Sequence, residues 1–522
     1  MSVLVYLAGI ALPFSNYLMP PRLVVLVFAV ISLTASSRAA IEKLEVNFDY
    51  VRKLAAERAA SPYQEPDRKL PERLATLNYD DNREIRFRPD QALWRKEDLP
   101  FQLHLFHRTS AVREAVQIRE FSSTHVQTIP FIRDFYNYGR LGDLGWMRSS
   151  MGYAGFRIHY PVNRPDVYDE LIAFQGASYF RALGSNQIYG LSARGLAVDS
   201  GVIGKIEEFP VFTDFWIGKP LPGAKSLVIY ALLDSARVAG AYEFVVHPGR
   251  ETVIDVRVEL SFRSQVDLPG YAPLTSMFWY GKNSDRPAGD PRPEVHDSDG
   301  LMLQSADGAH LWRPLQNPAD ILNTDLKSTK PVRFGLVQRD RTITHYEDFE
   351  ARYHERPSVF IEPVGDWGAG SVRLVELPTH NEYGDNIVAY WVPEKKPGPD
   401  KPAAFAYRMS WALDQPSDDG LARVFSTRTG NLPGGGKGRL FWIDFAGADL
   451  GKRDSANMAP QFEIGPGAHI RHQTLIRHPG IDGWRVALQI EPDGAPRPVE
   501  LRCRLRDGYQ PISETWVYTW IP

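Results

Sequence analysis

The residues best suited to chemistry in this sequence are carboxylates in two turn-rich segments that stand near aromatic side chains. Residues 292–300 (RPEVHDSDG) contain Asp297, and residues 376–386 (ELPTHNEYGDN) contain Asp385. Glycoside hydrolysis needs such a pair, because one carboxylic acid protonates the leaving oxygen and the other acts as base or nucleophile. Aspartates are also ordinary turn formers, so a purely structural role for both segments is the alternative.

Aromatic and polar side chains near these segments are candidates for holding a sugar chain. Flat rings can cover the apolar faces of sugars, whereas charged groups can bond to their hydroxyls. The candidate ligands are Trp279, Tyr280, His296, Trp312, Arg313, Trp367, Glu382 and Tyr390. For each aromatic residue the alternative is a place in the core of a β-sheet.

Other motifs in the sequence do not support a different chemistry. Residues 434–438 (GGGKG) lack the Ser or Thr and the frame of a phosphate-binding loop. Residues 190–195 (GLSARG) have one residue too many for a nucleophile elbow. The histidines of one strand-like tract lack the helical spacing of metal ligands: His469, His472 and His478. We therefore expect no metal and no cofactor.

The composition is typical of a soluble, globular, turn-rich chain. Of its 522 residues 43% are hydrophobic and 24% are charged, which excludes disorder throughout. A formal net charge of −3 without any long basic run excludes nucleic acid as a partner. The 41 glycines and 40 prolines favour many turns and a β-rich chain.

The hydrophobic pattern predicts one early helix followed by strands. Residues 47–60 (NFDYVRKLAAERAA) have helical periodicity, with Asn47 as the expected cap. Residues 254–262 (IDVRVELSF) alternate apolar and polar side chains, which predicts a strand with one buried face. Strands do not alternate with long helices along the chain, so a parallel α/β sheet is excluded. The sequence predicts an all-β protein.

A proline- and lysine-rich stretch predicts a linker at residues 393–402 (PEKKPGPDKP). Residues 41–392 would then form one large β-sandwich domain. Residues 403–522 hold short alternating strands, which suit one immunoglobulin-like sandwich. Cys503, the only cysteine, lies on the apolar phase of its strand, so we expect it in the core and exclude an intramolecular disulfide.

Residues 1–40 have the three parts of a secretory signal peptide. Arg22 precedes the apolar run 23–33 (LVVLVFAVISL), and small residues follow up to Ala39 and Ala40. We expect cleavage after one of these alanines and export to the periplasm. A membrane anchor is the alternative, although each apolar run is shorter than the roughly 20 residues that a span needs.

Eight segments in order along the chain carry a resemblance to a known family. They are 176–181 (GASYFR), 189–197 (YGLSARGLA), 207–210 (EEFP), 230–234 (YALLD), 272–278 (APLTSMF), 312–315 (WRPL), 385–391 (DNIVAYW) and 513–516 (SETW). In them the chain resembles the periplasmic glucan biosynthesis proteins G and D, over nearly the whole mature sequence. Residues 421–430 and the segment around Cys503 are more similar to D, whereas the single arginine of the signal departs from the twin-arginine signal of many D proteins.

The resemblance implies a galactose-mutarotase-like β-sandwich followed by an immunoglobulin-like domain. It implies work on osmoregulated periplasmic glucans, whose backbone is β-1,2-linked glucose, as an inverting glycoside hydrolase or transglycosylase. Carried over by motif, Asp385 would be the general acid, and Asp297 would be the general base acting through a relay of hydroxyls and water. The expected partners are β-1,2-glucan and the inner-membrane glucan synthase machinery.

Two other functions are compatible with the same resemblance. A non-catalytic module could bind nascent glucan and act as a scaffold for its assembly. A mutarotase-like epimerase is suggested by the fold alone, and fold does not fix function. The enzyme and the scaffold differ in one observable, because only the enzyme makes new chain ends or cyclic products from β-1,2-glucan.

Overall fold

The computed structural model describes residues 45–142, 147, 149–416, 419–494 and 497–522. The chain divides into two units, Met1–Glu45 and Val46–Pro522, and every helix and strand of the described residues belongs to the second unit. The predicted signal peptide, residues 1–40, lies outside the described residues. In the part of the chain that is described, no helix is both long and apolar enough to cross a membrane.

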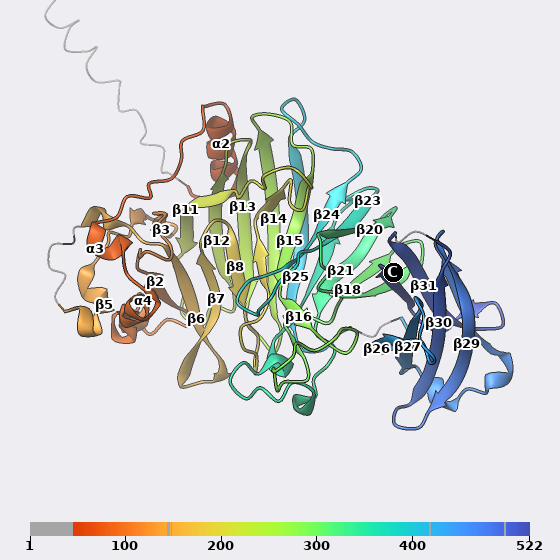
Figure 1. Ribbon diagram of the computed structural model, residues 1–522. Helices are drawn as coiled ribbons and strands as arrows, with labels where there is room; N and C mark the ends of the chain where they lie inside the picture. Colours follow the sequence, from red (N-terminus) through yellow and green to blue (C-terminus); the bar gives the residue numbers. More distant parts are fainter. Residues whose placement is uncertain (1–44, 143–146, 148, 417–418, 495–496) are drawn as a thin grey trace, which may run out of the picture. The chain divides into compact units, whose positions relative to one another are not determined.

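Strands dominate the second unit, which confirms the predicted all-β class (Figure 1). One sheet has ten strands, in the order β2 (Gln102–Phe106), β6 (Gly155–Arg164), β7 (Val167–Gln175), β8 (Tyr179–Ala182), β9 (Ser192–Arg194), β15 (Pro269–Ser276), β24 (Ile387–Pro393), β23 (Gly370–Glu376) and β20 (Leu322–Ser328), with β10 (Leu196–Val198) also paired to β15.

A second sheet of fifteen strands faces it and continues past it. Its order is β28 (Met458–Ile464), β31 (Val499–Asp507), β33 (Thr515–Trp520), β19 (His310–Pro314), β18 (Gly300–Ser305), β21 (Pro331–Val337), β22 (Ser358–Val364), β25 (Ala403–Ala412), β14 (Thr252–Phe262), β13 (Val238–His247), β12 (Leu227–Asp234), β11 (Val211–Gly218), β3 (Gln117–Phe121) and β4 (Val126–Thr128), with β32 (Gln510–Pro511) paired to β31.

Three smaller sheets complete the strands of the described residues. A four-stranded sheet has the order β26 (Arg423–Asn431), β27 (Arg439–Ala446), β30 (Gly483–Pro492) and β29 (Ala468–His478). The two-stranded sheets pair β1 (Arg86–Phe87) with β5 (Tyr136–Asn137), and β16 (Phe278–Tyr280) with β17 (Val295–His296).

The helices of the described residues are short. The α-helices are α2 (Phe48–Ala59), α3 (Glu72–Ala75) and α4 (Tyr79–Glu84). The 3₁₀ helices are η1 (Pro89–Gln91), η2 (Arg95–Glu97), η3 (Arg133–Phe135), η4 (Gly139–Leu141), η5 (Ser149–Met151), η6 (Ile343–His345), η7 (Tyr353–Glu355), η8 (Leu450–Lys452) and η9 (Ser455–Asn457).

The helix and the strand predicted from the pattern are both confirmed. Asn47 caps α2, because its Oδ1 accepts the backbone N–H of Tyr50 at 2.9 Å. The apolar face of α2 packs on the outer side of β12 and β13. In β14 the alternate residues Ile254, Val256 and Val258 are buried. This is the pattern of a strand with one face in the core and one face towards solvent.

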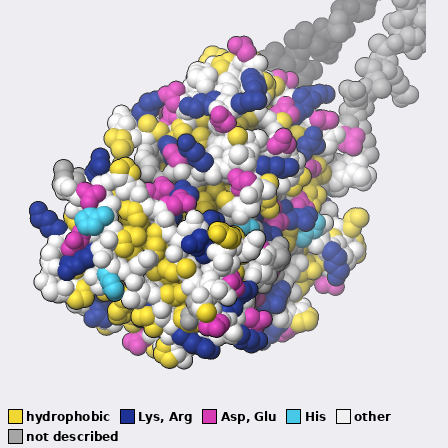
Figure 2. Space-filling model, turned by 90° about the vertical axis from the view of Figure 1, so that its right-hand side faces the viewer, with side chains coloured by type: hydrophobic (Ala, Val, Ile, Leu, Met, Phe, Trp, Pro, Cys, Tyr) yellow, Lys and Arg dark blue, Asp and Glu magenta, His cyan; other side chains and the backbone are white. Residues whose placement is uncertain are grey.

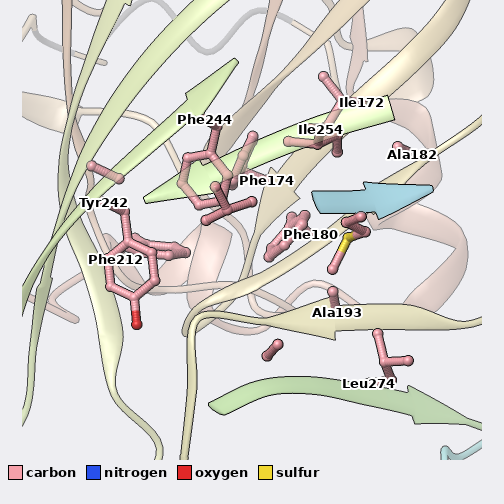
Figure 3. Packing of buried hydrophobic residues seen from close by; sticks show 14 of the residues in the cluster. Ile172, Phe174, Phe180, Ala182, Ala193, Phe212, Tyr242, Phe244, Ile254 and Leu274 are labelled. Carbon is pink, nitrogen blue, oxygen red and sulfur yellow. The ribbon is translucent and has the colours of Figure 1, made fainter. Parts of the chain in front are cut away.

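Aromatic rings fill the space between the two large sheets (Figure 3). Phe174 and Phe180 enter from the ten-stranded sheet, and Phe212 and Phe244 enter from the other. Phe174 and Phe244 meet edge to face, with ring centroids 5.2 Å apart. Because such rings are fully removed from water, each contributes roughly 1.5–3 kcal/mol to folding.

The fifteen-stranded sheet also forms one wall of a second core. Leu301 and Leu303 of β18 face the first core, whereas Met302 between them faces the second. The other wall is the four-stranded sheet, which contributes Phe441 among others. Cys503 of β31 is buried in this core, as predicted.

The position of β25 corrects the predicted domain boundary. Pro393 ends β24 of the ten-stranded sheet, and Ala403 begins β25 of the fifteen-stranded sheet. β25 pairs with β14 and β22, so it is a central strand of the large sandwich. Residues 393–402 therefore connect the two sheets of one sandwich rather than two domains, and the C-terminal sandwich begins after residue 412.

The surface at the C-terminal end carries both signs of charge. Figure 2 shows Lys and Arg side chains interspersed with Asp and Glu over this face. Pairs such as Arg471 with Glu491, at 2.7 Å, cross from β29 to β30. Opposite charges on neighbouring strands reduce the net field of this face.

Candidate active site

Hydrogen bonds to the backbone of Met277 and Phe278, two of them made by the side-chain amide of Asn386, bring the two candidate aspartates to one short segment, although they are far apart in sequence. The N–H of Asp297 donates to the carbonyl of Met277 at 2.8 Å. Asn386, directly after Asp385, accepts the N–H of Phe278 at 2.8 Å and donates to its carbonyl at 3.0 Å. Because Met277 and Phe278 are consecutive, the two aspartates flank the same backbone.

The Asp297 carboxyl is buried and bonded to a guanidinium. Its residue is 4% exposed, and Arg356 Nη1 donates to its Oδ1. Burial raises the pKa of Asp297, the positive charge of Arg356 lowers it, and the negative charge of Asp385 raises it. The two carboxyl groups therefore lie within electrostatic range of each other.

The Asp385 carboxyl enters a pocket of about 550 Å³. Asp385 as a whole residue is exposed to solvent. Its carboxyl group is nevertheless largely surrounded by protein, and this burial raises the pKa of Asp385. The charges of Arg181 and Arg194 and hydrogen bonds from Thr275 and Ser192 oppose that rise. Asp385 therefore interacts with Arg181 and Arg194 through long-range electrostatics. Asp297, in contrast, is hydrogen-bonded directly to Arg356.

The rest of the pocket comes from strands β2 and β6–β9. Its lining comprises Phe106, Arg157, Glu170, Ala173, Gln175, Tyr179, Phe180, Arg181, Tyr189 and Ser192. Three of these rings, those of Phe106, Tyr179 and Tyr189, are partly exposed and could stack on sugar faces. Glu170 accepts hydrogen bonds from the hydroxyl of Tyr189 and from Arg157 Nη1, the latter at 2.8 Å.

These pocket residues are not predicted from the sequence, although a signal for some of them is present there. Tyr179, Arg181, Tyr189 and Ser192 lie within the segments 176–181 and 189–197, which carried the family resemblance. Their distance along the chain from Asp385 hid their relation to it.

Glu382 joins the Asp385 loop to the Asp297 segment. Its Oε2 accepts a hydrogen bond from Arg292 Nη1 at 2.7 Å and another from the hydroxyl of Tyr353. The ring of Tyr353 lies under the guanidinium of Arg356, 4.2 Å from its centroid. Glu382 therefore belongs to the network that supports the site.

Trp279 and Tyr280 lie beside this network. Trp279 is partly exposed, and its ring centroid is 6.0 Å from the Arg292 guanidinium. Tyr280 is 1% exposed and donates its hydroxyl hydrogen to the carbonyl of Arg292 at 3.3 Å. Of the two, only Trp279 offers a surface to a ligand in this structure.

Three predicted sugar-binding aromatic residues do not line the pocket that Asp385 enters. Tyr390 is fully buried and donates to the carbonyl of Ser200 at 2.5 Å. Trp367 donates to the carbonyl of Ala406 at 2.9 Å and packs against the first core. Trp312 lies in the second core. The structure therefore places none of the three rings in the lining of the Asp385 pocket, and Trp367, which is partly exposed, stays a predicted ligand.

Arg313 does not line this pocket either. It is fully buried, and its Nη2 donates to Oε2 of the equally buried Glu376 at 2.8 Å. Glu376 also accepts the N–H of Gln316 at 2.6 Å. Burial raises the pKa of Glu376 to about 7, although Arg313 opposes the rise. Since Glu376 is the last residue of β23, this pair anchors the loop that carries Asp385.

His296 is not part of the lining of the pocket that Asp385 enters. It is 1% exposed, and its ring nitrogens contact Glu294 and Gln338.

Two overlapping groups could geometrically hold a metal ion: Glu294, His296 and Asp299, and Glu294, Asp340 and His345. The ammonium of Lys282 bonds to Asp340 and lies 3.4 Å from Glu294. The Lys282 cation thus already lies beside two of these carboxylates, Glu294 and Asp340.

A family model described as "Periplasmic glucan biosynthesis protein, MdoG" matches residues 46–520. This chain belongs to that family. As a periplasmic glucan biosynthesis protein it takes part in glucan biosynthesis, and the resemblance found in the eight segments is confirmed.

Curated relatives extend the match. A "Glucans biosynthesis protein G" of Bradyrhizobium diazoefficiens is 44% identical over 474 residues, which cover 91% of this chain and 93% of the relative. Another of Ralstonia nicotianae is 44% identical over 494 residues, 93% and 97% of the two chains. A third of Rhodopseudomonas palustris is 43% identical over 486 residues, 93% and 95%. All three are named G, which does not support the leaning towards D.

Proposed function

We propose that this periplasmic glucan biosynthesis protein cleaves or transfers β-1,2-glucan with inversion at the anomeric carbon. Asp385 is the general acid and protonates the glycosidic oxygen in the pocket. Asp297 is the general base and accepts the proton of the attacking water or sugar hydroxyl. The periplasm is the proposed location, reached through the signal peptide at residues 1–40.

The observation that carries the proposal is the difference between the two carboxyl environments. An inverting enzyme needs one carboxyl to keep its proton and the other to lose it. Burial raises the pKa of both carboxyls, but in the described part of the chain only Asp297 of the two accepts a hydrogen bond from a guanidinium, and only Asp385 lines the pocket. This difference in bonded cation and in access supports Asp385 as the acid and Asp297 as the base.

The position of Asp297 supports an indirect proton transfer. Asp297 is buried and does not line the 550 Å³ pocket that Asp385 enters. A nucleophile in that pocket would therefore give up its proton through intervening hydroxyls or water, as the family resemblance implied.

The test is to incubate the purified protein with linear β-1,2-glucan and to analyse products by mass, linkage and anomeric configuration. We expect new chain ends or cyclic products whose anomeric configuration is opposite to that of the substrate. Binding of the glucan without any product would instead favour the non-catalytic scaffold.

Asp385→Asn keeps the shape of the side chain but cannot donate an acidic proton. We expect it to fold normally and to lose roughly 10²- to 10⁴-fold in turnover, the usual contribution of general acid catalysis. Asp400→Asn, on an exposed turn, is the matched control and should keep full activity. Undiminished turnover in Asp385→Asn would remove Asp385 from the mechanism.

A further inference from the structure

A buried polar cluster lies next to Asp297 and contributes no residue to the lining of the 550 Å³ pocket. Its centre is His296, whose ring packs on Phe278 with a centroid distance of 5.3 Å and meets the edge of Tyr346 at 5.2 Å. Both ring nitrogens have polar partners: Nδ1 contacts Gln338, and Nε2 contacts Glu294. Because imidazole bonds differently in its neutral and charged forms, these partners determine its protonation state.

The Gln338 side chain can be oriented from its other contacts. Its amide nitrogen donates to the carbonyl of His296 at 3.0 Å and to the carbonyl of Tyr353 at 3.2 Å. The opposite orientation would turn its oxygen towards two carbonyl oxygens, which cannot donate. Gln338 Oε1 therefore faces His296 Nδ1 at 3.0 Å as an acceptor, and Nδ1 carries a hydrogen.

The other ring nitrogen faces acceptors as well. His296 Nε2 lies 3.2 Å from Glu294 Oε2 and 3.7 Å from Asp299 Oδ1. An ionised carboxylate accepts hydrogen bonds only, so Nε2 also carries a hydrogen. With hydrogens on both nitrogens the ring is an imidazolium.

From this geometry we infer that His296 is a permanently charged positioning residue for the proposed base, Asp297. The inference rests on the proposed function for its catalytic consequence but not for the charge itself. Burial opposes the charge, while Glu294, Asp299 and Asp340 favour it, and the net effect raises the pKa of His296.

The charges around His296 favour this state. Three carboxylates face the ring from its own segment and from the loop after β21: Glu294, Asp299 and Asp340. Lys282 lies against Glu294 and Asp340, and His345 Nδ1 contacts Asp340 Oδ2 at 2.6 Å. Arg341 also acts on Asp299 and Asp340 through its positive charge. Lys282 and His296 both lie against Glu294, so a charged His296 adds to the positive charge that offsets these buried carboxylates.

The cluster reaches Asp297 in two ways. The imidazolium favours the ionised form of the adjacent Asp297 through its charge. Gln338 also ties the backbone of His296 to that of Tyr353, which precedes Arg356 by three residues. His296 and Gln338 together therefore fix the spacing between the Asp297 carboxylate and the Arg356 guanidinium.

A divalent cation held by Glu294, His296 and Asp299 is the competing explanation of the same residues. It would require Nε2 to be without its hydrogen, because a metal occupies that lone pair. The protonation state of His296 Nε2 therefore distinguishes a charged histidine from a bound divalent cation.

The direct test is nitrogen-15 NMR of the whole protein labelled at its 13 histidines. We expect one ring, identified through contacts with the Phe278 and Tyr346 rings, to show both nitrogens in the imidazolium form from pH 5 to pH 8. A neutral ring in that range would overturn the inference. So would a signal that changes when a chelator is added. This measurement needs no variant and no catalytic activity.

The catalytic consequence is tested with His296→Gln, which keeps hydrogen-bonding capacity but carries no charge. We expect the acidic limb of the kcat/KM profile to move to higher pH, because Asp297 becomes harder to ionise, with kcat reduced about 10-fold. His247→Gln, at a half-exposed histidine of β13, is the matched control and should leave the profile unchanged. An unmoved acidic limb in folded His296→Gln would overturn the positioning role. Absence of all activity in the wild type would instead refute the proposed function and leave the charge to the NMR test.

Discussion

At the level of single residues, the two aspartates differ in the cations that contact them. Arg356 is bonded to Asp297, so replacing it by methionine removes the positive charge that opposes the effect of burial on the pKa of this carboxyl. We expect Arg356→Met to raise the pKa of Asp297, to move the acidic limb of the rate profile to higher pH and to lower kcat roughly 10²-fold. Arg408→Met, which breaks an exposed pair with Asp255, serves as the control for initial rates measured across pH. An unchanged acidic limb would contradict the assignment of Asp297 as base.

Arg181 influences the proposed acid, Asp385, as Arg356 influences the proposed base. Its removal should affect the alkaline limb of the rate profile instead of the acidic limb. Its charge lowers the pKa of Asp385, so its removal favours the protonated acid. We therefore expect Arg181→Met to extend activity towards higher pH, visible as an upward shift of the alkaline limb of kcat. Because Arg181 also lines the pocket, KM can rise, and the shift is read at saturating glucan. A shift to lower pH would exclude Asp385 as the acid.

At the level of elements, the buried pair of Arg313 and Glu376 anchors the loop between β23 and β24. Removing one partner leaves an uncompensated buried charge, so we expect Arg313→Leu to cost about 3–5 kcal/mol of unfolding free energy. The double variant with Glu376→Leu should recover most of this loss, because no charge is then left buried. Arg373→Leu, at a more exposed pair with Asp325, should change stability by no more than about 1 kcal/mol.

The loss in Arg313→Leu should depend on pH. Burial raises the pKa of Glu376 to about 7 even with Arg313 present, above its value in the unfolded chain. The folded variant then binds a proton that the unfolded chain releases, so its stability falls as pH rises. Denaturant melts at pH 5 and pH 8 should show the larger deficit at pH 8. An equal deficit at both would mean that the carboxyl keeps its charge without Arg313.

Local patterns predicted individual elements well and spatial relations poorly. The helix after Asn47 and the strand at 254–262 follow from side-chain periodicity, which is a property of neighbouring residues. The packing of Trp367 against the first core and the burial of Tyr390 do not, because an aromatic side chain suits a core and a sugar platform equally. The boundary at residue 403 failed because a proline-rich connection between two sheets has the same composition as a linker between domains.

In the candidate site, too, individual residues could be predicted from the sequence, whereas their spatial neighbours could not. Asp297 and Asp385 were found through motifs, and the structure brings both to the segment of Met277 and Phe278. The pocket walls come from β2 and β6–β9, so only the order of strands in the sheet reveals them. Glu376 illustrates a third case, since nothing in the sequence predicts that its charge is fully buried.

At the scale of the whole second unit, one sheet serves two cores. Leu303 and Met302 are neighbours in β18 but face the first and the second core, respectively. A strand cannot unfold on one face only, so loss of either core should release the other. We expect Leu303→Ala and Met302→Ala each to cost about 2–5 kcal/mol and to shift one common unfolding transition.

This prediction is checked by urea denaturation followed by near-ultraviolet circular dichroism and by limited proteolysis. Trp411 belongs to the first core and Trp516 to the second, so signals from tryptophans in both regions should change together. Their loss at different urea concentrations, with Met302→Ala moving only the second, would show that the C-terminal sandwich unfolds by itself. Parallel pairing of β19 with β33 argues against that outcome, because it continues the hydrogen-bonded sheet from one core to the other.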